Sequence, residues 1–183
     1  MSSAGRRYAE LTFALCVMLA ATPVHGQEAA VFGDLAGEWR GAGTLLGRTA
    51  EFSMCWEPGD GFAVLRFANA FVDADVRVPV LNAAAVYRTS PANPEAVWLD
   101  SRGVRVEIRW EASDSALVSH WTAPTEEGRT TYRVRSAAEL EVVDEVSTGD
   151  GWRTFGTADY TRAPGIRPER RCRHPGPEAG ATR

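Results

Sequence analysis

Short runs in which apolar and polar residues alternate recur along the chain, separated by residues that favour turns. The clearest run, residues 104–111, has Arg and Glu on one face and apolar residues on the other: Val104, Val106, Ile108 and Trp110. We count about ten such runs between Gly37 and Arg162. Their short connections favour an all-β, antiparallel up-and-down arrangement, and closure into a single barrel would leave no exposed edge strand.

The first 26 residues have the features of an export signal. Arg6 and Arg7 precede an apolar run at residues 11–21, which is too short to span a bilayer, and cleavage is expected before Gln27. An uncleaved anchor is the alternative. We see no second hydrophobic run, so we expect a secreted or periplasmic protein without an integral membrane segment after cleavage.

The predicted order along the chain is therefore simple. A signal peptide (1–26) and a short lead-in (27–34) precede one barrel domain (35–163), and an Arg- and Pro-rich tail (164–183) is expected to be disordered.

Charge argues against a nucleic-acid partner. The whole chain has 20 Lys+Arg against 24 Asp+Glu, a formal net charge of −4. The predicted signal and the tail are both basic, so the barrel between them is more acidic than the whole, with a net charge of about −8. Phosphates would be repelled by such a body.

Two cysteines, Cys55 and Cys172, remain after the predicted cleavage. In an oxidising compartment they form an obvious disulfide pair, which would attach the tail to the second strand. The alternative is two free or intermolecular thiols.

The start of the first strand carries a short motif. Gly37 precedes Trp39, and Gly41 and Gly43 keep the strand narrow enough for a sharp bend or a close crossing. This Gly-x-Trp near the start of a strand-rich chain resembles the lipocalin and fatty-acid-binding (calycin) barrels. The resemblance implies that the indole seals one end of the barrel under an arginine of the last strand. Arg162 is the matching residue, as a cation–π partner.

The strand count resembles fatty-acid-binding proteins and nitrobindin-type bacterial barrels more than eight-stranded lipocalins. The similarity is architectural and covers about residues 35–162. Fatty-acid-binding proteins hold carboxylates with an Arg-x-Tyr pair, which is reversed here in Tyr160-Thr161-Arg162. Nitrobindin-type barrels bind haem through a histidine near the end of the domain. His120 is the only matching candidate within the predicted barrel, because His174 lies in the tail.

Several polar groups interrupt apolar strand faces, as a ligand pocket requires. His120, Tyr132 and Asp144 fall on neighbouring strands and could converge inside the barrel, with Arg66 as a partner for the buried acid. Trp110 would line the same interior. These five residues are the predicted ligand-binding set for a small apolar or amphipathic molecule.

Two alternatives remain open at this point. The interior could be packed solid, which would leave an interaction module of the cell envelope, or His120 could serve a haem-binding or enzymatic barrel, for example as an acid–base pair with Asp144. The motifs of hydrolases, nucleotide-binding loops and zinc sites are missing from the sequence, so we predict no catalytic residue and no metal site.

Overall fold

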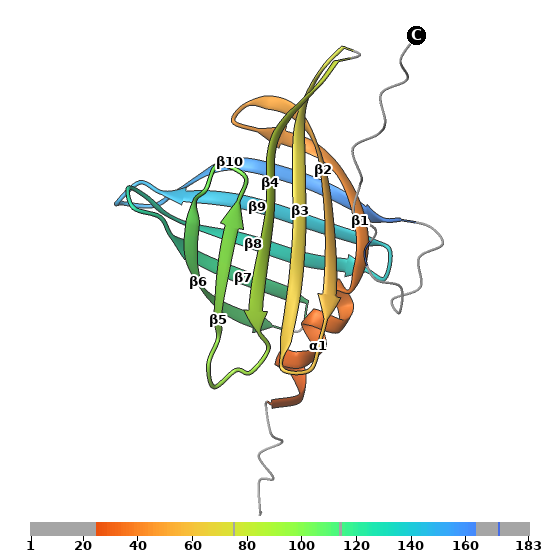
Figure 1. The fold of residues 1–183 in the computed structure, drawn as a ribbon, viewed down its shortest axis with the longest axis vertical. Coiled ribbons are helices and arrows are strands. Elements are labelled where there is room, and N and C mark those ends of the chain that lie inside the picture. Colours follow the sequence, from red (N-terminus) through yellow and green to blue (C-terminus); the bar gives the residue numbers. More distant parts are fainter. Residues whose placement is uncertain (1–24, 75, 114, 164–171, 173–183) are drawn as a thin grey trace, which may run out of the picture.

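The computed structural model describes residues 25–74, 76–113, 115–163 and 172. Its body is a closed barrel of antiparallel strands (Figure 1), in which each strand pairs with its neighbours in sequence and β1 pairs with β10 to close the ring. The predicted fold class, an all-β up-and-down barrel of about ten strands, is confirmed. The elements are α1 (His25–Leu35), β1 (Gly37–Leu45), β2 (Arg48–Pro58), β3 (Phe62–Asp73), β4 (Val76–Arg88), β5 (Glu95–Asp100), β6 (Arg105–Ser113), β7 (Ala116–Thr122), β8 (Glu127–Ser136), β9 (Glu139–Ser147) and β10 (Trp152–Arg162).

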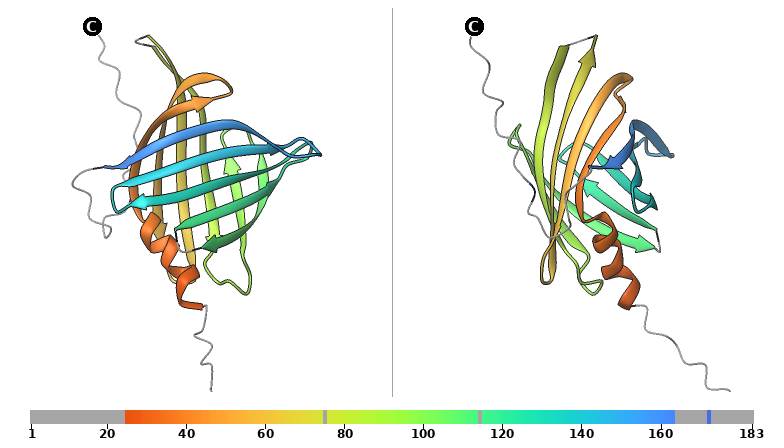
Figure 2. Two further views of the ribbon diagram at one scale, coloured as in Figure 1. Left: turned by 180° about the vertical axis from the view of Figure 1, so that it is seen from behind. Right: turned by 90° about the vertical axis from the view of Figure 1, so that its right-hand side faces the viewer.

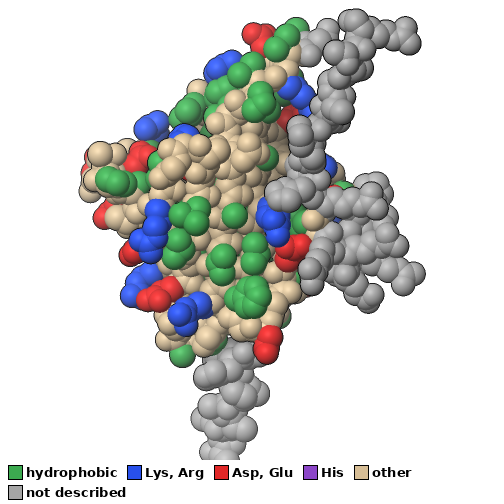
Figure 3. Space-filling model, viewed as in Figure 1, with side chains coloured by type: hydrophobic (Ala, Val, Ile, Leu, Met, Phe, Trp, Pro, Cys, Tyr) green, Lys and Arg blue, Asp and Glu red, His purple; other side chains and the backbone are tan. Residues whose placement is uncertain are grey.

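Alternation along the strands separates the interior from the solvent. On β6, Ile108 and Trp110 are buried, while Glu107 and Arg109 between them are exposed. Outward side chains on adjacent strands pair by charge, as in the contact between Arg129 and Glu145 at 2.6 Å. The face over β3–β5 mixes such charges with scattered hydrophobic side chains (Figure 3).

The segment before the barrel is helical. Residues 27–34, predicted to be a short lead-in, belong to α1, which covers one end of the barrel (Figure 2). Val31, Phe32 and Leu35 are almost completely buried there. The Phe32 ring meets Trp110 edge-on, with 5.2 Å between ring centroids. The buried apolar residues of α1 span too few helical turns for their spacing to predict a long amphipathic helix.

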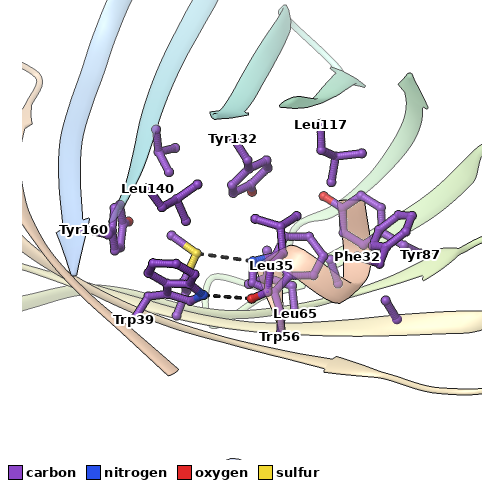
Figure 4. Close-up of a cluster of buried hydrophobic side chains, with 14 of the residues drawn as sticks. Phe32, Leu35, Trp39, Trp56, Leu65, Tyr87, Leu117, Tyr132, Leu140 and Tyr160 are labelled. Atoms are coloured by element: carbon purple, nitrogen blue, oxygen red, sulfur yellow. Dashed lines mark hydrogen bonds between the residues drawn. The ribbon is translucent and has the colours of Figure 1, made fainter. Parts of the chain in front are cut away.

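Trp39 lies beside the end of α1 and is fully buried (Figure 4). Its indole N–H donates to the carbonyl of Leu35 at 2.8 Å. The Arg162 guanidinium lies 4.1 Å from the centroid of the Trp39 ring, which is the contact implied by the calycin resemblance. Arg162 therefore fastens the last strand to the indole that seals this end.

Arg162 also holds the backbone around that end. Its guanidinium donates to the carbonyl of Ala36, to that of Asp34 at 2.8 Å and to that of Ala137 at 2.6 Å. One side chain thus joins the carbonyl end of α1, the start of β1 and the turn between β8 and β9. Asp34 lies in the last turn of α1, where its carbonyl has no partner within the helix.

Cys55 and Cys172 form a disulfide, with 6.0 Å between their Cα atoms. The backbone N–H of Cys172 also donates to Glu57 at 2.8 Å. Residues 1–24, which hold most of the predicted signal, and the rest of the predicted disordered tail lie outside the described residues. Within the part of the chain that the structure describes, we find no helix with the length and apolar character needed to cross a membrane.

Candidate ligand-binding cavity

The barrel is not filled from end to end. A cavity of about 540 Å³ occupies the half away from α1 and reaches the hairpins β1–β2, β5–β6 and β7–β8. At the closed end, α1 and the aromatic cluster around it fill the interior (Figure 4). The sequence of the barrel thus produces one packed half and one hollow half.

The floor of the cavity carries hydroxyl groups. Tyr87, Tyr132, Tyr160 and Ser119 are buried and line it from β4, β8, β10 and β7. The Tyr87 and Ser119 hydroxyls form a hydrogen bond of 3.0 Å. Burial raises the pKa of Tyr87 to about 12, although its hydrogen bonds with Ser119 and Tyr132 offset part of that rise. Burial likewise raises the pKa values of Tyr132 and Tyr160, so these phenols are neutral donors and acceptors.

A carboxyl group, that of Asp144, lines the cavity from β9. The residue is half-buried because it faces the cavity, and protein surrounds it on its other sides. Its Oδ1 accepts a hydrogen bond of 2.7 Å from the Thr130 hydroxyl. Burial raises the pKa of the Asp144 carboxyl to about 6, and the Thr130 hydrogen bond lowers it only in part. No cation forms an ion pair with Asp144 among the described residues.

Glycines on neighbouring strands leave room for three cavity-lining side chains. A Cβ on Gly41 would lie 2.7 Å from the ring of Tyr160, and one on Gly156 would lie 3.0 Å from Oδ2 of Asp144. A Cβ on Gly128 would overlap the Trp121 ring. Each glycine therefore allows a bulky or polar group to sit against the backbone of the neighbouring strand.

Above the polar floor, the walls are aromatic and aliphatic. Trp98, Trp121 and Phe155 line the cavity, and the rings of Trp121 and Phe155 meet edge-on at 6.4 Å. Val142 and Val146 flank Asp144 on the same face of β9. An apolar wall with a few polar groups at depth is the usual composition of a small-molecule site.

Charged residues frame the mouth. Asp100, Arg102, Glu126 and Arg153 line the cavity from hairpins or strand ends. Arg102 is tied to Asp100 by a contact of 2.6 Å. Burial opposes ionisation of Asp100, but hydrogen bonds from Arg102 and Val104 outweigh it and leave its pKa below the ordinary value.

One buried polar atom facing this region has no partner. Asn69, on β3, is 8% exposed and lines the cavity, and its Oδ1 makes no hydrogen bond within the described structure. Such orphaned acceptors are rare in folded proteins.

The structure brings together two of the five predicted ligand-binding residues. Tyr132 and Asp144 both line the cavity. The expectation that His120 joins them is wrong, because His120 points outward from β7 and its Nε2 lies 3.2 Å from Glu111. Ser119 occupies the inward position instead. The prediction chose the wrong face of β7, and a shift of one residue exchanges the faces of a strand.

Arg66 and Trp110 lie elsewhere. Arg66 is exposed on the outer face, 3.2 Å from Glu57, and borders a separate groove near the disulfide. It therefore does not neutralise Asp144. Trp110 is buried in the packed end, where its indole N–H donates to the carbonyl of Arg88 at 2.9 Å, and it does not line the cavity.

Some of the cavity's polar residues are not in the predicted ligand-binding set. They are Asn69, Tyr87, Ser119 and Thr130. A signal for Ser119 exists: Leu117 and Trp121 alternate with it and are larger apolar residues than Val118 on the other face. Asn69 has no such signal, because the β3–β4 register shifts between Asn69 and Ala70.

Comparison with known proteins places the fold but not a family. No family model and no curated protein matches the sequence. Rv2717c from M. tuberculosis is similar in structure, with a TM-score of 0.54 and 18% identity over 74% of this chain and 97% of that one. The S-type phycobiliprotein lyase CPES from Guillardia theta has a TM-score of 0.51 and 9% identity over 79% of this chain and all of its own. At these identities the likenesses show the fold alone, a closed antiparallel β-barrel.

Proposed function

We propose that this protein is an exported binding barrel that holds one small amphipathic molecule in the open half of its interior. The observation that carries the proposal is the cavity of about 540 Å³, which falls within the usual size range of small-molecule sites. Its hydroxyl-bearing floor and aromatic walls favour a ligand with an apolar body and a polar end.

Two features of the cavity oppose the alternatives. An interaction module with a packed interior would bury its aromatic side chains against one another, as the α1 end does, rather than line an open space with Trp98 and Trp121. A haem site or an acid–base pair built on His120 would need that side chain inside, and it faces outward.

Export is part of the proposal. It is supported by the pattern of residues 1–26 and by the pairing of Cys55 with Cys172, since disulfides persist in oxidising compartments. Cell fractionation of the native host, with immunodetection of the processed chain, would test it. Recovery of the full-length chain in the cytosol would contradict it.

The cavity is tested with the neutral fluorescent probe N-phenyl-1-naphthylamine. Its fluorescence should rise and saturate on titration with the protein, because the apolar walls exclude water from the dye. Val142→Phe extends a ring into the cavity from β9 and should weaken binding by about tenfold or more. Val143→Phe is the matched control, since Val143 is the next residue on β9 and does not line the cavity.

Circular dichroism melting curves of each variant exclude misfolding as the cause. If Val142→Phe melts early, Val106→Phe replaces it, since Val106 lines the cavity nearer the mouth. Equal probe binding by the wild type, both cavity variants and Val143→Phe would contradict a ligand site inside the barrel.

A further inference from the structure

The charged groups of the cavity are unevenly distributed in depth. Among its lining residues, Asp100, Arg102, Glu126 and Arg153 all come from the hairpins or strand ends of the mouth. Asp144 alone lies within the body of a strand, between Val142 and Val146. The deep part of the cavity therefore presents a single formal charge, and that charge is negative.

Among the described residues, Asp144 has a hydrogen-bond donor but no ion pair with a cation. Arg153 lines the same cavity from β10, where it lies opposite Val146, and it forms no ion pair with Asp144. Thr130 on β8 donates to Oδ1, and Oδ2 lies close to Gly156 on β10, whose missing side chain leaves room for the carboxyl group. The other titratable groups near it are the phenols of Tyr87, Tyr132 and Tyr160, all neutral because burial raises their pKa values. Arg129 and Glu145, the nearest charges along these strands, pair with each other on the outer face.

A carboxylate without a cation in such a place is costly, and proteins usually pair a buried charge or keep it neutral. Burial raises the pKa of Asp144 to about 6, so at neutral pH the group is largely ionised and unpaired. An uncharged residue such as Asn or Val at this position would avoid the free-energy cost of the buried charge. The position is therefore one where function, rather than stability, accounts for the acid.

Building on the proposed function, we infer that the ligand carries a protonated amine whose N–H groups donate to the Asp144 carboxylate. An ammonium group supplies the missing cation and forms a charge-assisted hydrogen bond. Tyr132 and Tyr160 line the same cavity, and aromatic rings are suitable neighbours for a cation as well. A ligand carboxylate, as in a fatty acid, would meet a like charge and no deep arginine.

Three matched ligands test this inference. Naphthalen-1-ylmethylamine, naphthalen-1-ylmethanol and naphthalene-1-carboxylic acid share one apolar body and differ in the polar end. Titration calorimetry at pH 7.5 should show the amine binding about tenfold or more tighter than the alcohol, and the acid weakest. Asp144→Asn should remove the preference for the amine while binding of the alcohol stays within about threefold. Asp159→Asn, on the outer face of β10, is the control and should behave as the wild type.

The pH dependence gives a second readout. The ammonium group stays protonated between pH 5 and 7.5, as a lysine does. Protonation of Asp144, with its pKa of about 6, should weaken amine binding by about tenfold at pH 5, and Asp144→Asn should abolish that loss. His120 lies on the outer face, where it pairs with Glu111, so His120→Gln is the control and should retain the pH dependence.

The outcomes separate the two proposals. Equal binding of the three ligands by the wild type, or an unchanged preference in Asp144→Asn, would overturn the amine inference and leave the cavity intact. If neither the three ligands nor N-phenyl-1-naphthylamine binds, the binding barrel itself is wrong and the inference falls with it.

Discussion

At the end of the barrel covered by α1, aromatic side chains contact one another, whereas at the opposite end they line an open cavity. At the closed end, the indole N–H of Trp39 has a hydrogen-bond acceptor, and the Arg162 guanidinium lies over its ring. At the open end, polar groups lack partners within the described structure: Asp144 has no cation and Asn69 Oδ1 has no hydrogen bond. The difference teaches that one barrel can pack one half closed and leave the other half hollow, with unpaired polar groups facing the space.

The largest effect should come from the closed end. Trp39→Ala removes a fully buried indole and leaves a void under Arg162, so we expect a loss of about 3–5 kcal/mol in the free energy of unfolding. Trp152→Ala is the matched control at the mouth, where the ring is 43% exposed. Its loss should stay within about 1 kcal/mol. Urea unfolding measures both, and equal losses would mean that the two ends do not differ in packing.

Arg162→Lys tests the same end more finely. Lysine keeps the charge, but its single nitrogen cannot reach the three carbonyls that the three nitrogens of Arg162 contact, so the expected loss is about 2 kcal/mol. Arg109→Lys is the control, because Arg109 is exposed and lies 3.8 Å from Glu95. That change should fall within about 0.5 kcal/mol. A similar small loss for Arg162→Lys would show that the fork geometry does not hold the end of α1.

At the open end, a substitution should stabilise the protein. Burial raises the pKa of Asp144 to about 6 in the folded state, above its ordinary value in the unfolded chain. Protonated Asp144 therefore favours the folded state near pH 4, and this stabilisation is lost as the pH rises through 6. Asp144→Asn does not ionise and should be more stable than the wild type by about 1–3 kcal/mol at pH 7.5. The advantage should disappear near pH 4. Urea unfolding across this range measures it, and a less stable variant at pH 7.5 would show that the carboxylate has a cationic partner.

The smallest effect belongs to the outer surface. His120→Gln removes an exposed pair with Glu111, and we expect a change in unfolding free energy within about 0.5 kcal/mol. Binding of N-phenyl-1-naphthylamine should not change. A tenfold loss of probe binding would return His120 to the interior and contradict the observed register of β7.

The sequence predicted the barrel because alternation is a property of each strand alone. Residues 104–111 are an example: their apolar positions turn inward and their charges outward. The contact between Trp39 and Arg162 also could be expected, since the resemblance supplied a partner 123 positions away that alternation could not.

The cavity was harder to predict, because it depends on which face of each strand turns inward and on where the filling stops. One misjudged strand placed His120 inside instead of Ser119. Arg66 interrupts an apolar run but points outward. Because β3 has apolar residues on both faces, the sequence does not show which face turns inward. The depth to which α1 fills the barrel depends on tertiary packing. The size of the empty space beyond it therefore cannot be predicted from the local sequence pattern.

The central claim is that the open half holds an ionisable acid, Asp144, that has no cationic partner among the described residues. Carbon-13 NMR of the side-chain carboxyls, titrated with pH and assigned by loss of the signal in Asp144→Asn, tests it most directly. The account predicts an apparent pKa of about 6 for Asp144 in the free protein and a clearly lower value with naphthalen-1-ylmethylamine bound. A pKa near the ordinary value of about 3.9, unchanged by the amine, would contradict it.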